Sequence, residues 1–278
     1  MSKLGLIAGG GGLPVSLARH CRAVGREVFV LRLAAFADPA LEAFDGCEVG
    51  LAQLGKAIAA LRRSGCAAVC LAGSVARPDF GALRADRRGL AALPGAILAA
   101  RRGDDALLGF LLGEFEKEGF AVEGADRVME SLTLSAGVLG RHRPSPEDLV
   151  DIERALAVAR EIGRMDVGQG AVCCRGVTLA TEAQEGTDAM LGRIPLLPKA
   201  IRGCPSAPRG VLAQACKPLQ DRRVDLPTIG PATVRAAAQA GLAGIAGEVG
   251  RLLIVERETV IELADELGLF VFGAPPGP

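Results

Sequence analysis

The sequence lacks the side chains on which nucleic-acid-binding proteins rely. It contains no tryptophan and no tyrosine, and aromatic residues make up only 3% of its 278 positions. Bases stack on aromatic rings, and phosphate backbones bind surfaces that carry an excess of Lys and Arg. Here 32 Lys and Arg residues balance 32 Asp and Glu residues, and the pI is about 6.8. We therefore expect no nucleic-acid partner.

Membrane spans, secretion signals and zinc sites are missing from the pattern as well. No run reaches the roughly 18 unbroken apolar residues of a membrane helix, and the opening MSKLGLIAGGGGLP breaks into glycines too early for a secretory signal. None of the eight cysteines forms a Cys-x-x-Cys pair, and the only histidines are His20 and His142, so a structural zinc site has no good ligand set. We expect a cytoplasmic protein whose cysteines are small buried hydrophobic residues and whose histidines are structural or on the surface.

Apolar runs alternate with helical patterns along the whole chain. Residues 3–8 predict a strand, glycines 9–12 a turn and Leu13-Pro14 the start of a helix; further strands are expected at 27–33 and from Cys66. This order predicts an α/β protein with an N-terminal Rossmann-like domain on a parallel sheet (1–130), a linker (131–145) and a second α/β domain (146–278). The second domain opens with a helix capped at Ser145-Pro146, and the late LFVFG (269–273) is predicted to be a last edge strand.

Short polar or flexible residues follow two of the predicted strands. Gly10, Gly11 and Gly12 come after the first strand and Ser74 after the third, and the carboxyl ends of parallel strands meet at one edge of a sheet. The glycines are either a tight turn needed for packing or a contact for phosphate or sugar. An NAD(P)-dependent oxidoreductase is an alternative, although Pro14 replaces the third glycine or alanine of a dinucleotide motif and no acidic residue ends the second strand.

Two helical stretches precede the linker. In residues 79–102, five arginines flank the apolar GLAALPGAILAA, which is either a helical hairpin that offers contact to lipid or a partner, or a core helix with solvated ends. The next stretch, GDDALLGFLLGEFEKEG, predicts a helix capped by Asp104 or Asp105. Because one aspartate suffices for capping, the other remains available as a ligand.

Charged residues concentrate at two places in the second domain. Between Pro218 and Pro227 lie Lys217, Asp221, Arg222, Arg223 and Asp225, and the spacing of the two aspartates places them on one side of a turn or strand. Carboxylates bind hard divalent cations and Arg and Lys bind phosphate, so the segment suits a metal-bound phosphate ester; the alternative is a solvated charged loop. Upstream, Glu182, Glu185, Thr187 and Asp188 cluster around Gly186, where Thr187 could also cap a helix.

Several motifs resemble one family across nearly the whole chain. They are LIAGGGGLP at the N-terminus, GSVARP around Ser74, GDDALL around Asp104, DVGQ (166–169), EGTD (185–188) and KPLQDRRVDLPTIG (217–230). Together they resemble the LpxI-type UDP-2,3-diacylglucosamine pyrophosphatases. The resemblance implies a magnesium-dependent hydrolase of the lipid A pathway, with two domains and the substrate between them. Its products would be UMP and 2,3-diacylglucosamine 1-phosphate (lipid X), formed when water attacks the β-phosphate.

The resemblance also implies roles for individual residues. The expected catalytic residues are Asp225, Asp104, Asp188 and Lys217, and the expected Mg²⁺ ligands are Asp225, Asp104 and Glu182. The expected substrate contacts are Gly10, Gly11, Gly12, Ser74, Gln169, Thr187 and Arg223. The partner would be a glycolipid nucleotide, with peripheral contact to the cytoplasmic face of the inner membrane and a homo-oligomer as further expectations. A non-catalytic protein that binds nucleotide sugars or acylated lipids is the third hypothesis.

Overall fold

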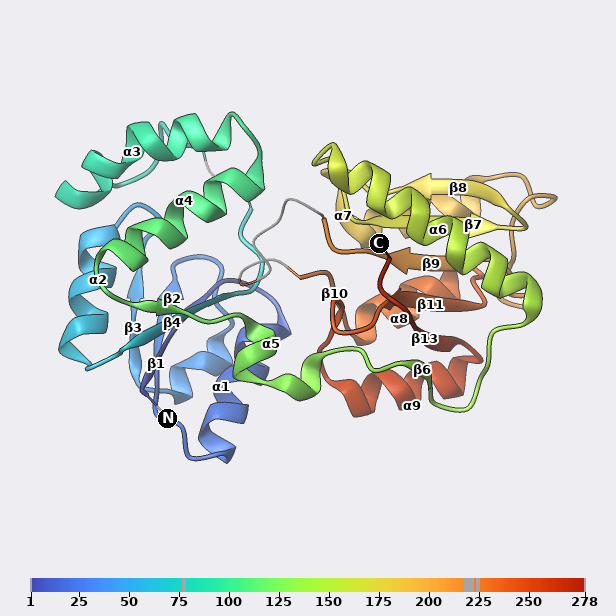
Figure 1. Ribbon diagram of the computed structural model, residues 1–278, viewed down its shortest axis with the longest axis horizontal. Coiled ribbons are helices and arrows are strands. Elements are labelled where there is room, and N and C mark those ends of the chain that lie inside the picture. Colours follow the sequence, from blue (N-terminus) through green and yellow to red (C-terminus); the bar gives the residue numbers. More distant parts are fainter. Residues whose placement is uncertain (1, 77–78, 218–222, 224–225, 278) are drawn as a thin grey trace. The chain divides into compact units, whose positions relative to one another are not determined.

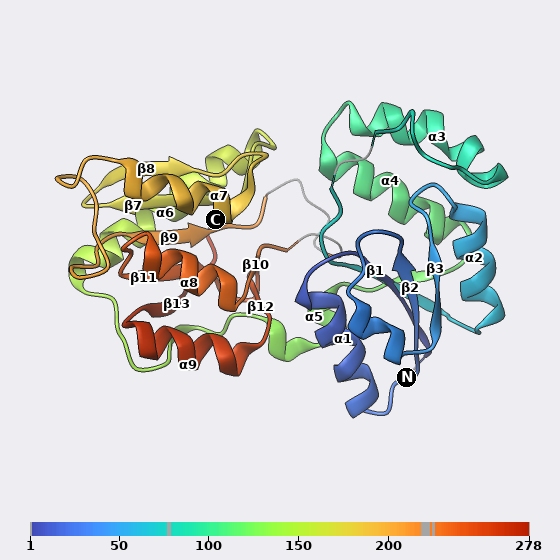
Figure 2. The same ribbon diagram turned by 180° about the vertical axis from the view of Figure 1, so that it is seen from behind.

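The computed structural model describes residues 2–76, 79–217, 223 and 226–277. Contacts divide the chain into two units: the first comprises Met1–Glu130 and takes in Arg223, and the second comprises Ser131–Gln220 and Leu226–Pro278. Both units are α/β, as Figures 1 and 2 show from opposite sides.

The first unit is built on a five-stranded sheet. Its strands are β1 (Leu4–Ala8), β2 (Val28–Leu33), β3 (Gly46–Val49), β4 (Ala68–Ala72) and β5 (Ala121–Val122). Its helices are α1 (Gly12–Ala23), α2 (Leu54–Arg63), α3 (Arg87–Ala100), α4 (Asp104–Lys117) and α5 (Ala125–Val128), with a 3-10 turn, η1 (Pro39–Ala43). The strands are all parallel in the order β3-β2-β1-β4-β5, which is the order of a Rossmann-type sheet. The predicted Rossmann-like domain is confirmed.

Strand alternation explains how this sheet is covered. Successive side chains of a strand point to opposite faces, and Ile7, Leu31 and Val69 share the face that packs against α2 and against Phe115 of α4. The helices α1 and α5 contact β1, β2 and β4 on the other side (Figure 1). The strands are apolar on both faces because both faces are buried.

The second unit contains a six-stranded mixed sheet. Its strands are β6 (Gly137–Leu139), β13 (Phe270–Ala274), β11 (Gly244–Glu248), β9 (Val211–Gln214), β7 (Gly170–Cys174) and β8 (Val177–Thr181), in that spatial order; β10 (Thr228–Ile229) and β12 (Leu253–Ile254) form a separate parallel pair. Its helices are α6 (Pro146–Arg164), α7 (Gly186–Arg193), α8 (Pro231–Gln239) and α9 (Arg257–Leu267), with 3-10 turns η2 (Glu130–Leu132) at the boundary and η3 (Ile194–Leu196). The strands β13, β11 and β9 are parallel, and the outer pairings are antiparallel.

Helices cover both faces of the second sheet. Ala171, Val211 and Ala246 pack against α6, whereas the adjacent Val172, Leu212 and Ile245 pack against α7, α8 and α9. The sequence predicted where α6 begins: the Ser145 hydroxyl accepts from the Asp148 amide, and Asp148 accepts from the Ser145 amide. Arg175 and Gly176 form the turn between the antiparallel strands β7 and β8.

The segment between the predicted domains differs from an irregular linker. Residues 137–139 form β6, which pairs antiparallel with β13, so the late strand that was predicted at an edge is an interior strand. The strand β6 could not be predicted from the sequence because it has only three residues, begins at Gly137 and is followed by Gly140. Both glycines have positive φ. The backbone hydrogen bonds of β6 cover what would otherwise be the exposed edge of β13.

The cysteines are free thiols in the structure. Six are buried, as predicted, and Cys47 and Cys204 are partly exposed. Burial raises the pKa of the Cys70 thiol to about 12, an effect to which nearby Glu123 adds. Such a thiol is unreactive at neutral pH and acts as a packed hydrophobic group.

Candidate functional site

The glycine turn after β1 lies beside the end of β4. The Gly10 amide donates to the Ser74 carbonyl (2.8 Å), and the Ser74 amide donates to the Gly10 carbonyl (3.0 Å). Gly73 (φ 92°) allows this approach, because a Cβ there would lie 2.5 Å from the Gly10 oxygen. At Gly11 (φ 85°), by contrast, a Cβ would meet nothing within 4 Å. The predicted meeting of the two loops at one edge is confirmed.

This edge borders an apolar cavity of about 430 Å³ within the first unit. Its walls come from the sheet, α2, α3 and α4, and among the described residues that line it only Gln53, Ser74 and Asp104 have polar side chains. A mostly apolar cavity with a few polar groups is the usual form of a small-molecule site. Ser74 and Asp104, which the sequence predicted separately, therefore line one cavity.

Asp104 does not cap its helix. The residue before α4 is Gly103 (φ 125°), which makes no side-chain cap, and Asp104 and Asp105 both lie in the first turn. The prediction that one of them is the N-cap is wrong, because only glycine adopts this backbone conformation easily. Two carboxylates in the first turn still interact favourably with the helix dipole.

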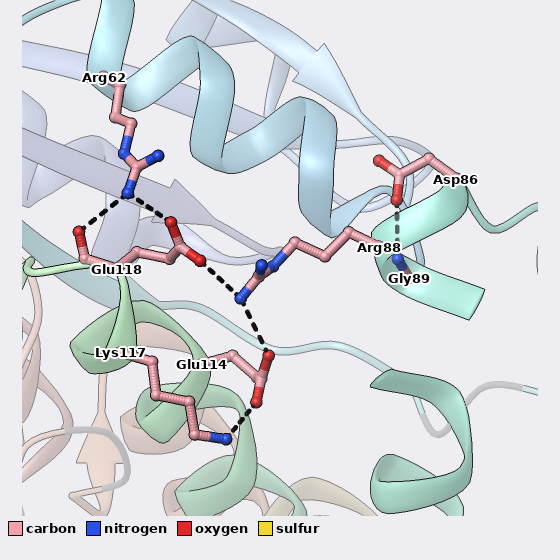
Figure 3. Close-up of polar contacts among 7 residues, drawn as sticks. All are labelled: Arg62, Asp86, Arg88, Gly89, Glu114, Lys117 and Glu118. Carbon is pink, nitrogen blue, oxygen red and sulfur yellow. Dashed lines mark hydrogen bonds and ion pairs between the residues drawn. The ribbon is translucent and has the colours of Figure 1, made fainter. Parts of the chain in front are cut away.

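Ion pairs tie the three helices around the cavity together (Figure 3). Arg88 of α3 binds Glu114 of α4 (3.4 Å) and Glu118 (2.6 Å), the residue that follows α4, and Glu118 also binds Arg62 of α2 (2.5 Å). Lys117 completes the group by binding Glu114 (2.6 Å). Exposed pairs contribute little singly, but Arg88 bridges two carboxylates, so the group fixes α3 against α4.

Asp86 anchors the start of α3 to α2. Its carboxylate accepts from the Gly89 amide (2.8 Å), which caps α3, and from the Lys56 amide (2.8 Å) at the start of α2. Burial alone would raise the pKa of Asp86, but these backbone hydrogen bonds outweigh it and hold the pKa below its ordinary value. The cap therefore functions as a charged carboxylate at neutral pH.

In the second unit, a hydrogen-bonded chain joins three strand ends to the start of α7. The Gln214 amide nitrogen donates to the Thr187 hydroxyl (2.9 Å), which donates to the buried Glu182 carboxylate (2.8 Å). The Gln169 backbone amide reaches the other oxygen of Glu182 at 3.4 Å. Thr187 makes no cap for α7, so its predicted alternative role is not observed.

Two amide oxygens of this group are buried without a hydrogen-bond partner among the described residues. They belong to the side chains of Gln169 and Gln214. Buried polar atoms are nearly always paired, so an unpaired acceptor marks a place where a ligand or water donates. Gln214 was not among the predicted site residues; the signal that could have found it was a polar residue in the otherwise apolar strand VLAQACK.

Lys217, predicted to be catalytic, follows β9 in the second unit. Its ammonium binds Asp166 at 2.6 Å, and only 12% of the Lys217 side chain is exposed. Asp166 opens the DVGQ motif but had no predicted role. An ammonium has three donors, so Lys217 can bind Asp166 and a phosphate oxygen together.

The other predicted site residues are divided between the two units. Arg223 binds Glu116 of α4 at 2.6 Å, and Asp188 is exposed in the first turn of α7. Asp104 belongs to the first unit and Glu182 to the second. Asp225, the central residue of the prediction, lies outside the described residues.

The described residues include two of the three predicted Mg²⁺ ligands, Asp104 and Glu182. Among the described residues, no group of three or more His, Cys, Asp or Glu side chains is arranged to hold a metal ion. The ligands Asp104, Glu182 and Asp225 therefore remain a prediction. Nor does any helix in the described ranges combine the length and apolar character needed to cross a bilayer.

Comparisons with known proteins agree with the motifs over both units. A family model described as the LpxI N-terminal domain matches residues 3–132, and one described as the LpxI C-terminal domain matches residues 135–272. The UDP-2,3-diacylglucosamine pyrophosphatase LpxI of Caulobacter vibrioides is 62% identical over 276 residues, which cover 99% of each chain.

Solved structures give a weaker comparison. The UDP-glucose 4-epimerase of Thermus thermophilus, in complex with NAD, is 15% identical and has a TM-score of 0.32, with 99% of this chain and 87% of that one covered. This score is too low to carry an argument about fold or function. Because both domain models and the full-length relative match, the chain belongs to the LpxI family.

Proposed function

We propose that this protein hydrolyses the diphosphate of UDP-2,3-diacylglucosamine and releases UMP and 2,3-diacylglucosamine 1-phosphate, a step of lipid A biosynthesis. The observation that carries the proposal is the full-length identity to the Caulobacter protein, whose name states this activity. The oxidoreductase alternative has no comparable support, and Pro14 still breaks its glycine motif.

The cavity of the first unit supports a lipid substrate. The described residues that line it are apolar apart from Gln53, Ser74 and Asp104, and acyl chains gain free energy in proportion to the apolar area that they bury. We assign an acyl chain to this cavity, with the sugar near Ser74 and the Gly10–Gly12 turn at its edge. The amides at the start of α1 then point toward an anionic group.

The second unit supports recognition of the nucleotide sugar. The unpaired amide oxygens of Gln169 and Gln214 accept hydrogen bonds, and the hydroxyl groups and the uracil N–H of the substrate donate them. Thr187 and Gln214 hold the Glu182 carboxylate in a fixed orientation. These residues would bind and orient rather than react.

The chemical step transfers the β-phosphoryl group to water. The water oxygen forms a bond to the β-phosphorus, the bond to the bridging oxygen breaks, and UMP leaves with that oxygen. Negative phosphate oxygens repel a nucleophile, so the site requires cations and a positioned water. Lys217 and Arg223 would neutralise the diphosphate, and Asp225, with Asp104 or Asp188, would orient the water.

We also propose that the reaction depends on Mg²⁺. A bound Mg²⁺ supplies charge neutralisation at phosphate oxygens, and it usually binds one or two carboxylates together with the substrate's phosphates rather than an all-protein cage.

The test is turnover of UDP-2,3-diacylglucosamine by the purified protein, followed as UMP release. We expect activity with Mg²⁺, loss of activity in EDTA, and a loss of at least about a hundredfold in Asp225→Ala with substrate binding retained. Glu153→Ala removes an exposed carboxylate on α6 and should behave as the wild type. An absence of UMP would refute the hydrolase, whereas binding without turnover would favour the non-catalytic binder.

Isotope labelling separates the two phosphorus atoms. In ¹⁸O-water, attack on the β-phosphorus places the label in the diacylglucosamine 1-phosphate. Label in UMP would contradict the proposed direction of attack while leaving the hydrolase itself intact.

A further inference from the structure

The helix α3 presents apolar side chains on its outer side. Leu90 is 59% exposed and Leu98 is 62% exposed, and Ala91 and Pro94 between them are exposed too. In Figures 1 and 2, α3 lies at the outer border of the first unit, beyond α4. Large exposed apolar side chains that gather on one helix indicate a contact surface.

The spacing of these residues defines one continuous face. Residues 90, 94 and 98 recur at intervals of four and residue 91 lies three before residue 94, which places these four along one side of a helix. The opposite side carries Gly89, Ala92, Leu93 and Ala96, which line the cavity. A helix that is apolar on both sides is normally buried, so the outer face requires a cover of its own.

Basic residues border this apolar face at both ends. Arg84 and Arg87 precede it and Arg101 and Arg102 follow it, and all four are exposed. No acidic residue occurs from Arg87 to Arg102. An apolar strip bounded by arginines is complementary to an anionic bilayer, whose headgroups attract the arginines while the acyl region receives the leucines.

We propose that the outer face of α3 docks on an anionic lipid bilayer. The proposal rests on the proposed function, because a diacylated substrate resides in a membrane, and one helix would then face the bilayer with one side and the acyl-binding cavity with the other. A second copy of the chain that docked face to face on α3 would set these arginines against like charges, whereas the membrane that holds a diacylated substrate also supplies anionic headgroups. The structure therefore favours lipid.

Vesicle flotation of the full chain tests the surface. Vesicles of phosphatidylcholine with phosphatidylglycerol should bind the wild type, and vesicles of phosphatidylcholine alone should bind it weakly. The double variant Leu90→Glu/Leu98→Glu should lose at least about tenfold in partition, and Arg101→Gln/Arg102→Gln about fivefold for each charge removed. Circular dichroism checks that each variant is folded.

A matched control comes from α6 in the second unit. Leu149 and Val150 are also exposed, but Glu147 and Asp148 precede them. Leu149→Glu/Val150→Glu should leave vesicle binding unchanged. Binding that is absent in the wild type, that falls equally in this control, or that survives in the α3 variants would overturn the proposal. A wild-type oligomer that Leu90→Glu/Leu98→Glu dissociates would assign the face to a second copy instead.

The readouts separate this proposal from the proposed function. Flotation uses vesicles without substrate, so it holds or fails whether or not UMP is ever formed. If the enzyme is active, the α3 variants should lose turnover of substrate embedded in anionic vesicles and retain turnover of substrate in detergent micelles. Equal loss in both media would contradict a docking role.

Discussion

At the scale of single residues, Gln214 is the clearest addition to the candidate site. It is 1% exposed and reaches Glu182 only through Thr187. Gln214→Met keeps the volume but removes the donor, so the Thr187 hydroxyl is released to turn away from Glu182. We expect kcat/KM to fall about tenfold, the equivalent of one hydrogen bond.

A double-mutant cycle with Thr187→Val checks that the two residues act together. Coupled residues should lose less in combination than the sum of the single losses, with a coupling of about 0.5 to 3 kcal/mol. Thr178→Val is the control, since Thr178 lies on β8, the strand that precedes Glu182, but contacts Cys173 instead. Additive losses would show that Gln214 does not act through Thr187.

Residue types could be predicted better than their partners. The motifs singled out Gln169, Glu182, Thr187 and Lys217, and the structure gives each a defined environment. The links between them are long-range: Lys217 meets Asp166 across 51 positions and Thr187 meets Gln214 across 27. Spacing along a helix or strand reports only neighbours within a few residues, so Asp166 and Gln214 could not be found that way.

At the scale of elements, the start of α3 depends on Asp86. Asp86→Ala removes both acceptors, one for Gly89 and one for Lys56, and Asp86→Asn retains only one. We expect Asp86→Ala to lower the free energy of unfolding by about 0.5 to 2 kcal/mol, and Asp86→Asn by less. Urea unfolding at pH 7 measures the order, and a larger loss in Asp86→Asn would contradict the capping account.

The pH dependence of this cap follows from its lowered pKa. A carboxyl whose folded pKa lies below its unfolded value of about 3.9 contributes stability above that value. That contribution disappears as the pH falls through the folded pKa. The difference between wild type and Asp86→Ala should therefore be full at pH 6 and shrink below about pH 4.

The cavity makes a separate prediction for α3 and α4. Ala92 lines the cavity, whereas Ala91 is exposed on the opposite side of the same helix. Ala92→Leu should fill space and shift the preference in kcat/KM toward substrates with shorter acyl chains, as measured in detergent micelles. Ala91→Leu, the same substitution one residue away, should leave that preference unchanged. Equal chain-length profiles in all three proteins would exclude an acyl chain from the cavity.

Long regular elements could be predicted from the sequence, and short ones could not. The helix α6 carries a serine cap, a first-turn proline and a regular apolar stripe, so its start was predicted at the correct residue. The strand β6 has only three residues, the first of which is Gly137. It forms by pairing with β13, more than 130 positions later. Non-local pairing of this kind overrides local propensity.

At the scale of the whole molecule, the buried carboxylate of Glu248 connects a strand, a helix and the C-terminal segment of the second unit. Glu248 at the end of β11 is 1% exposed and accepts from Arg160 of α6 (2.8 and 2.9 Å) and from the Gly277 amide (2.9 Å). Glu248→Gln should lower the free energy of unfolding by about 2 to 3 kcal/mol, as expected for hydrogen bonds to a charged group. Glu161→Gln, in an exposed pair with Arg164, should change it by less than about 1 kcal/mol.

The pKa of Glu248 is lowered, so its contribution to stability depends on pH in the same direction as that of Asp86. Burial opposes ionisation, but the Gly277 amide and Arg160 outweigh it. The stabilisation is present above the unfolded pKa of about 4.3 and is lost as the pH falls through the folded pKa. Urea unfolding of wild type and Glu248→Gln should converge below about pH 4, and a gap that persists there would point to packing rather than charge.

The α/β class of both units could be predicted from alternating apolar runs, and the family from its motifs. The cavity could not, because it is bounded by residues from Ile7 to Phe115 that only the tertiary structure brings together.

The interior position of β13 has a consequence for biosynthesis. The first sheet has all its strands once residue 122 has been synthesised, but the second sheet keeps a vacancy between β6 and β11 until residue 274 has emerged. From the end of β6 at residue 139 to the end of β13 at residue 274, synthesis at about 5 to 20 residues per second takes an interval of roughly 7 to 27 seconds. Throughout it, the nascent second unit exposes unsatisfied strand edges, which makes it the half of the protein that chaperones would engage.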